Sequence, residues 1–192
     1  IIIWAPLNES WGVPDVTDPR QQSHLRALYH MTKSMDPSRL VIDNEGWQHT
    51  EATDLFAVHD YTANFEGLKA RWAKVEVKPG AALPPHGVNY LAPGNVYNGS
   101  PLYLSEFGGI AYILPGSKVP EEAWGYSGVE KTPEAALNRL SGQYDAIAQS
   151  PIIGICYTQI TDVEQEINGL MTYDRKPKFD VKKLKEMNDR LK

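Results

Sequence analysis

The chain has 192 residues, 42% of them hydrophobic and 22% charged, which suits one domain with a substantial core and is short for two. The net charge is −5 and the basic residues are dispersed apart from a Lys- and Arg-rich C-terminus, which argues against a nucleic-acid-binding surface. No apolar run approaches a membrane span, so we expect no membrane partner. The single cysteine, Cys156, excludes an internal disulfide, and its apolar surroundings predict that it is buried.

Hydrophobic patterning predicts that strands and helices alternate along the chain. Apolar runs indicate five strands, at residues 1–5, 39–43, 54–61, 101–107 and 151–159. Helix signals indicate four helices, within residues 17–35, around 64–75, from 132 to 150 and at 180–192.

Two of these helices carry specific start signals and an apolar face. In the first, Pro19 lies in the first turn, and one face is formed by Leu25, Leu28, Tyr29, Thr32 and Met35. In the third, Thr132 is the predicted N-cap and Pro133 the first helical residue, followed by an apolar stripe of Leu137, Leu140, Tyr144 and Ile147.

Continuous apolar strands alternating with amphipathic helices are typical of parallel strands covered by helices, so the predicted fold class is α/β. Five strands are too few for an eight-stranded barrel, which takes about 250 residues. No G-x-G-x-x-G or P-loop motif follows a strand, so the sequence gives no support for a nucleotide-binding sheet. The long segments 78–100 and 108–131, rich in Gly, Pro and aromatic residues, are candidate functional loops.

Polar residues of catalytic types stand where the predicted strands end. In parallel barrels these carboxyl ends carry the active site, because each loop directs its residue toward a common centre. The residues in question are Asn8 and Glu9, then Asp43, Asn44, Glu45 and Trp47, then His59, Asp60 and Tyr61, then Ser105 and Glu106, and finally Tyr157, Gln159 and Asp162.

Three segments carry a family resemblance. PLNESWG (6–12) and PLYLSEFGG (101–109) resemble the acid/base and nucleophile signatures of clan A glycoside hydrolases. The ending, IIGICYTQITDVEQEINGLMTYDRKPK (152–178), is similar to glycoside hydrolase family 2, which holds β-galactosidases, β-glucuronidases and β-mannosidases. The resemblance covers essentially the whole chain. It implies a partial (β/α)8 TIM barrel, with about strands 4 to 8 and their helices in one fragment spanning 1–192.

The resemblance implies a role for individual residues. Glu9 matches the acid/base, Glu106 the nucleophile, and Tyr61 the tyrosine that donates a hydrogen bond to the nucleophile. Asn8 matches the asparagine that binds the sugar 2-hydroxyl. Further residues expected to contact the substrate are Trp11, Asn44, Trp47, His59, Tyr157 and Gln159. We chose Glu9 over Glu45 because of its strand order relative to Glu106.

These roles predict double displacement. Retaining glycosidases hold two carboxyl groups about 5–5.5 Å apart, one attacking the anomeric carbon and the other protonating the departing oxygen. We expect Glu9 and Glu106 to face each other in this way. No metal-ligand spacing such as H-E-x-x-H is present, so we predict no catalytic metal and no cofactor.

The expected substrate is a β-linked sugar, with β-galactosides first. Glucuronidases of the family carry an Asn-x-Lys motif where this chain has Glu166-Ile167-Asn168-Gly169, without the lysine. Two alternatives remain: an inactive half-barrel that still binds carbohydrate, and a clan A polysaccharide hydrolase such as a mannanase. The sequence leaves the cellular compartment open.

The resemblance also implies that the first barrel half and the preceding β-sandwich domains are absent. Strands without neighbours would expose pairing edges, which invite association between chains. We therefore expect low or no turnover from these 192 residues, or an oligomer that covers the edges.

Overall fold

The computed structural model describes residues 1–85, 87 and 89–191; the segment 78–100 and the last predicted helix each include residues outside this set. Four helices are present in the described part, each overlapping a predicted one: α1 (Pro19–Met35), α2 (Phe65–Trp72), α3 (Pro133–Ile147) and α4 (Val181–Asn188). The strands are β1 (Ile3–Trp4), β2 (Leu40–Val41), β3 (Phe56–Asp60), β4 (Leu102–Gly108), β5 (Ala111–Tyr112), β6 (Val129–Glu130) and β7 (Ile152–Thr158).

The chain divides into two compact units, each described by itself below. Unit 1 comprises Ile1–His59, Val75–Ser105 and Pro151–Ile155, and unit 2 comprises Asp60–Lys74, Glu106–Ser150 and Cys156–Lys192. Strands β3, β4 and β7 begin in unit 1 and end in unit 2. Each unit therefore holds part of the same three strands.

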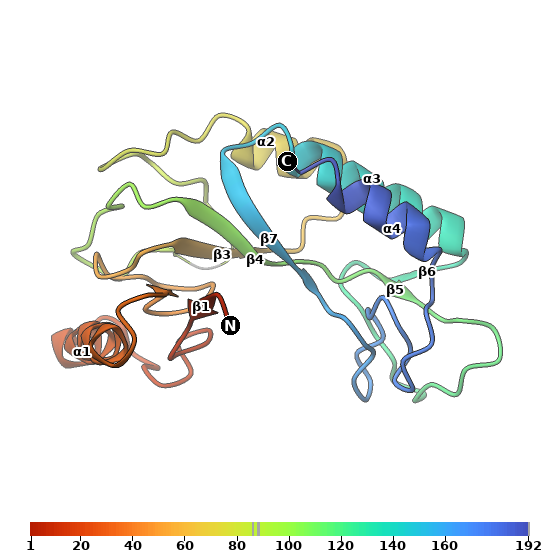
Figure 1. The fold of residues 1–192 in the computed structure, drawn as a ribbon, viewed down its shortest axis with the longest axis horizontal. Helices are drawn as coiled ribbons and strands as arrows, with labels where there is room; N and C mark the ends of the chain where they lie inside the picture. Colours follow the sequence, from red (N-terminus) through yellow and green to blue (C-terminus); the bar gives the residue numbers. More distant parts are fainter. Residues whose placement is uncertain (86, 88, 192) are drawn as a thin grey trace. The chain divides into compact units, whose positions relative to one another are not determined.

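The strands form a mixed α/β arrangement with parallel pairing (Figure 1). β1 pairs with β2 in parallel, β5 pairs with β6 in parallel, and the three-stranded sheet has the order β3-β4-β7. All five predicted strands are present, which confirms the α/β class, although β1 and β2 have only two residues each. The partial barrel of strands 4 to 8 stays a prediction.

Unit 1 is built around a small apolar cluster and one helix. Ile42, Leu55 and Ala57 are buried together, with Ile3 and Tyr103 packed against them. Helix α1 starts at the N-cap Asp18, whose side chain accepts a hydrogen bond from the Arg20 backbone N–H, with Pro19 in the first turn as predicted.

The predicted apolar face of α1 is only partly correct. Its buried residues are Gln22 and Leu25, whereas Met35 is 79% exposed. Leu28, Tyr29 and Thr32 of the predicted face are half-buried, so the prediction fails at Met35.

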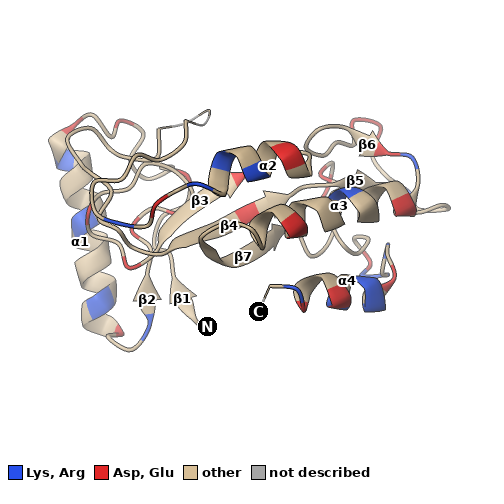
Figure 2. Ribbon diagram, turned by 90° about the horizontal axis from the view of Figure 1, so that it is seen from above, with Lys and Arg blue, Asp and Glu red and all other residues tan. Residues whose placement is uncertain are grey.

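Unit 2 gathers three helices. α2 packs against α3, and α3 packs against α4 (Figure 1). Helix α3 follows its sequence signals: the Thr132 side chain caps the Ala135 N–H, Pro133 opens the helix, and all four residues of the predicted stripe are buried. Charges of both signs are spread over these helices (Figure 2), in keeping with the dispersed basic residues noted in the sequence.

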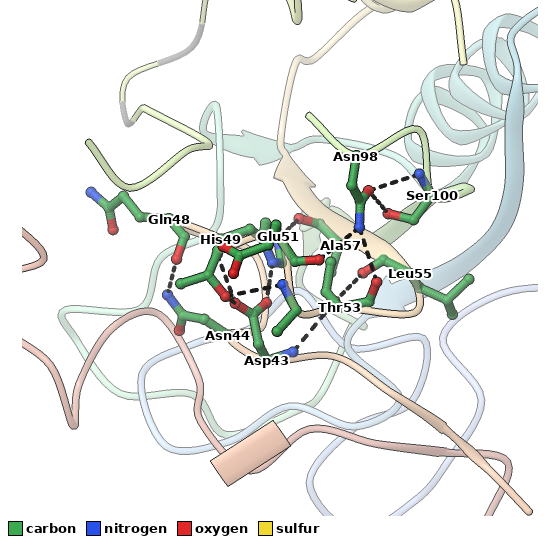
Figure 3. Close-up of polar contacts among 12 residues, drawn as sticks. Asp43, Asn44, Gln48, His49, Glu51, Thr53, Leu55, Ala57, Asn98 and Ser100 are labelled. Atoms are coloured by element: carbon green, nitrogen blue, oxygen red, sulfur yellow. Dashed lines mark hydrogen bonds and ion pairs between the residues drawn. The ribbon is translucent and has the colours of Figure 1, made fainter. Parts of the chain in front are cut away.

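A buried polar network supports the segment that follows β2 (Figure 3). The fully buried Asp43 lies 2.6 Å from His49 Nδ1, and its other oxygen accepts hydrogen bonds from the backbone N–H and hydroxyl of Thr50. His49 Nε2 lies 2.7 Å from the Ala57 carbonyl, so it must donate a proton to β3. This network fixes the Asp43 end of the segment that carries Asn44 and Glu45.

A second buried network holds the final bend of unit 2. Lys178 is 3% exposed, and its ammonium group donates to Asp162 Oδ1 and to the Ile167 carbonyl, each at 2.8 Å. Burial lowers the Lys178 pKa, while the hydrogen bond and charge of Asp162 oppose that shift. Lys178 belongs to the Lys- and Arg-rich C-terminus noted in the sequence, but unlike the exposed Lys176 it is buried.

The expectation for the cysteine is also wrong, because Cys156 is exposed. It lies in β7, which ends the three-stranded order, and Ile153 of the same strand is 66% exposed. Among the described residues, no helix has both the length and the apolar character needed to cross a membrane.

Candidate active site

In unit 1, the turns that follow β1 and β2 are joined through their backbones. The Glu9 N–H donates to the Glu45 carbonyl at 2.9 Å, and the Glu45 N–H donates to the Leu7 carbonyl at 2.8 Å. Glu9 and Ser10 both adopt left-handed backbone conformations, with φ of 49° and 60°. Such conformations cost energy in residues with side chains and need support from their surroundings.

Asn44 supplies that support. It is fully buried, its Oδ1 accepts from the Ser10 N–H at 2.9 Å, and its Nδ2 donates to the Ser10 hydroxyl and the Gln48 carbonyl, each at 2.8 Å. Figure 3 shows the contact between Asn44 and Gln48. These bonds occupy the amide group, so Asn44 holds the turn that carries Glu9, and its predicted contact with sugar stays a prediction.

His59, at the end of the unit 1 part of β3, lies between two glutamates. Its Nδ1 is 3.0 Å from Glu9 Oε1, and its Nε2 is 2.6 Å from Glu45 Oε2. The side chains are 6% exposed for His59, 26% for Glu9 and 14% for Glu45. Unit 1 therefore brings the predicted acid/base together with a histidine and a second carboxylate.

Gly46 leaves the space that His59 fills. Its φ is +78°, and a Cβ atom added there would lie 2.0 Å from His59 Nε2. A side chain at this position would displace the imidazole, so glycine is required by both conformation and space.

The outer side of Glu9 borders an apolar cavity. The cavity has a volume of about 250 Å³ and is lined by Glu9, Ser10, Trp11, Val13, Pro14, Val16, Trp47 and Gln48. Trp11 is 79% exposed and Trp47 is half-buried. Indole rings beside a carboxyl group suit the apolar face of a sugar ring, and the contacts of these two residues with substrate stay predictions. Asn8 is exposed and forms a bridge with Glu45.

In unit 2, the predicted nucleophile is bonded to the predicted tyrosine. The Tyr61 hydroxyl donates to Glu106 Oε2 over 2.5 Å. Burial raises the pKa of Tyr61 above its usual value near 10, and the hydrogen bond to Glu106 raises it further, so the phenol keeps its proton. The sequence-based pairing of these two residues is present in the structure.

The loop after β5 covers Tyr61 with a second aromatic residue. The Tyr126 ring is stacked on Tyr61, with centroids 3.5 Å apart and an interplanar angle of 1°. Gly109 allows this approach, since an added Cβ would lie 2.4 Å from Tyr126. Arg139 of α3 donates to the Tyr126 carbonyl at 2.9 Å and so ties the loop to the helix.

Tyr157 and Gln159 are engaged within unit 2. The Tyr157 hydroxyl donates to the Asn168 carbonyl at 3.0 Å and accepts from the Ile110 N–H at 3.3 Å. Gln159 Nε2 donates to the Glu166 carbonyl at 3.4 Å. Both residues line the bend after β7, and their predicted contacts with substrate stay predictions.

The predicted residues thus fall into two groups. Unit 1 holds Asn8, Glu9, Trp11, Asn44, Trp47 and His59, and unit 2 holds Tyr61, Glu106, Tyr157 and Gln159. Two neighbours in these groups are not among the predicted site residues: Glu45, which was weighed against Glu9 and set aside, and Tyr126. The DNEGW segment and the aromatic-rich loop 108–131 were noted, but no local pattern ranks these two residues above the others there.

Known proteins resemble this chain in structure and not in detectable sequence. Neither the protein-family models nor the curated proteins searched contain a match. A β-galacturonidase of glycoside hydrolase family 2 from Eisenbergiella tayi, solved with galacturonate, superposes over 100% of this chain and 34% of its own, with 17% identity and a TM-score of 0.64. The fold is that of a part of glycoside hydrolase family 2 enzymes.

Two further solved structures are also similar to this chain. An FMN-binding β-glucuronidase from Facaelibacterium prausnitzii L2-6 matches 94% of this chain and 27% of its own, with 17% identity and a TM-score of 0.58. An exo-β-agarase matches 88% and 22%, with 11% identity and a TM-score of 0.57. The chain spans about a third or less of the length of these three enzymes. At such identities the likeness concerns the fold alone, and the β-galactosidase prediction is not confirmed.

Proposed function

We propose that this chain carries the catalytic glutamates of a retaining β-glycosidase, within the C-terminal part of a family 2 barrel. The observation that carries the proposal is the hydrogen bond from Tyr61 to Glu106 in unit 2. A phenol that keeps its proton donates to a carboxylate and fixes the rotamer of a nucleophile. The positions of both residues agree with the family resemblance.

In the proposed reaction, ionised Glu106 attacks the anomeric carbon and forms a glycosyl ester. Glu9 gives its proton to the departing oxygen and then takes a proton from the water that cleaves the ester. The reaction therefore uses Glu9 in its protonated form in the first step and in its ionised form in the second. The mechanism requires the two carboxyl groups about 5–5.5 Å apart.

The cavity beside Glu9 supports a substrate with an apolar face, and β-galactosides are the first candidates. The absence of the lysine in 166–169 disfavours a β-glucuronide. The test is hydrolysis of nitrophenyl β-galactoside, β-mannoside, β-glucoside and β-glucuronide by the chain and by Glu9→Gln and Glu106→Gln. We expect slow turnover of at least one glycoside with retention of anomeric configuration, and a loss of about 100-fold or more from that rate in each variant. Unchanged turnover in Glu106→Gln refutes the assignment.

A second candidate is an inactive fragment that binds carbohydrate and associates through exposed strands. Ile1, Ile2 and Ile153 are 79%, 80% and 66% exposed, and such apolar surface favours self-association. No turnover, together with binding of galactose and a dimer or larger species in solution, supports this candidate. Cleavage of long β-mannans with little action on aryl glycosides supports a polysaccharide hydrolase instead.

A further inference from the structure

Glu45 occupies a position in unit 1 that the acid/base proposal does not use. Its carboxylate lies 2.6 Å from His59 Nε2, on the side of the ring opposite to Glu9, and its side chain is 14% exposed. Its Oε1 atom is buried without a hydrogen-bond partner among the described residues. A buried carboxylate held by a single ring is costly unless the ring is positively charged or the carboxyl group is protonated.

Backbone hydrogen bonds hold the turns that carry the two glutamates, so the arrangement does not depend on side-chain contacts alone. The reciprocal backbone bonds between the two turns set Glu9 and Glu45 beside each other, and Gly46 leaves room for His59 between them. Each member therefore has a fixed position before any substrate binds. A catalytic group needs supporting residues that hold it in a fixed position.

The number of protons on the His59 ring determines what the arrangement can do. Both ring nitrogens of His59 face a carboxyl oxygen, and a neutral imidazole carries only one N–H. Either the ring carries both protons, or one carboxyl group donates to it. A carboxylate at Nε2 favours the doubly protonated ring, and that ring then presents Nδ1–H to Glu9.

We infer that Glu45 is a positioning residue for Glu9 and acts through His59; the inference rests on the proposed role of Glu9. The Glu45 carboxylate holds the His59 ring as a donor at both nitrogens, so Nδ1–H binds Glu9 Oε1. This bond leaves the other oxygen of Glu9 to carry the proton that goes to the leaving group. His59 and Glu45 keep their own protonation states throughout, and only Glu9 gains and loses a proton.

The first test reads the ring protons and needs no turnover. The chain is labelled with ¹⁵N-histidine, and His59 is assigned by comparison with His59→Gln. We expect two protonated ring nitrogens at pH 7 in the unchanged chain and one in Glu45→Gln. A neutral His59 ring in the unchanged chain overturns the inference, whatever the chain's activity.

The second test separates positioning from mere structural support. A general acid matters most when the leaving group is poor, so kcat/KM is measured for phenyl and for 2,4-dinitrophenyl glycosides. Glu45→Gln is expected to lose about tenfold or more on the phenyl glycoside and less than about twofold on the dinitrophenyl glycoside. The control Glu66→Gln, an exposed residue of α2, is expected to change neither. Equal losses on both glycosides, or none, contradict the inference.

Failure of the proposed function gives a different result. If Glu9→Gln itself shows no dependence on the leaving group, Glu9 is not the acid and the fault lies with the proposed function. If Glu9→Gln shows that dependence and Glu45→Gln does not, only the role of Glu45 fails.

Discussion

The space left by Gly46 allows a sharp test of the Glu9–His59–Glu45 arrangement. Gly46→Ala places a Cβ 2.0 Å from His59 Nε2, in a residue with φ of +78°. The left-handed conformation alone costs about 1–2 kcal/mol for alanine. Displacing the imidazole from one carboxylate adds about 1.5–3 kcal/mol, the usual value for a hydrogen bond to a charged group.

Gly80 provides the matched control. It lies in the same unit with φ of +76°, and an added Cβ there meets nothing within 4 Å. Gly80→Ala therefore bears the conformational cost of about 1–2 kcal/mol without a collision. We expect Gly46→Ala to be less stable than Gly80→Ala by about 1.5–3 kcal/mol.

Urea unfolding followed by circular dichroism measures both variants against the unchanged chain. The comparison removes the effect of alanine on the unfolded chain, because both substitutions share it. Equal losses of unfolding free energy in the two variants would show that His59 does not fill the space at Gly46, and the arrangement described for unit 1 would then be wrong.

Two further predictions concern unit 2. Lys178→Met leaves the Asp162 carboxylate buried without its cation and should lower the unfolding free energy by about 3–5 kcal/mol. The control Lys176→Met, at an exposed position, should lower it by less than about 1 kcal/mol. Similar losses for the two variants in urea unfolding would contradict the burial of Lys178. The second prediction concerns pH. Burial and the hydrogen bond to Glu106 raise the Tyr61 pKa, so the folded chain keeps a phenolic proton that the unfolded chain loses above pH 10. The stabilisation from Tyr61 is therefore present below pH 10 and falls as the pH rises beyond it. The difference in unfolding free energy between the chain and Tyr61→Phe should accordingly shrink as the pH rises above about 10. A difference that stays constant above pH 10 would refute the raised pKa.

Elements with local signals were predictable from the sequence. The start of α3 follows from Thr132 and Pro133, and its buried face follows from a stripe at helical spacing. Both signals are contained in the helix itself. The apolar runs likewise predicted five of the seven strands among the described residues, because consecutive apolar residues indicate a buried strand. The short strands β5 and β6 lie in the loop 108–131 and were not predicted.

Features that depend on distant partners were not predictable. Met35 fits the apolar face of α1 by spacing, yet its side chain is exposed. Lys178 belongs to a basic run, but its burial depends on Asp162, which lies 16 residues earlier. Cys156 lies in an apolar run, yet its side chain is exposed, which the run itself does not indicate.

The candidate site likewise contains residues that the sequence predicted and a contact that it did not. Glu9, Tyr61 and Glu106 were found through motifs that the family resemblance identified. Glu45 was set aside, because an Asn-Glu pair is common by chance and its contact is to His59, 14 residues later in the chain. Only the fold brings that ring between the two glutamates.

Covalent trapping tests the central claim most directly. The chain is incubated with 2,4-dinitrophenyl 2-deoxy-2-fluoro-β-galactoside and with the matching mannoside and glucoside, then digested and analysed by mass spectrometry. The account predicts that a fluorosugar is attached to Glu106, and that Glu106→Gln takes up none. A fluorosugar on any other residue, or turnover of the parent glycosides without a labelled Glu106, would contradict it.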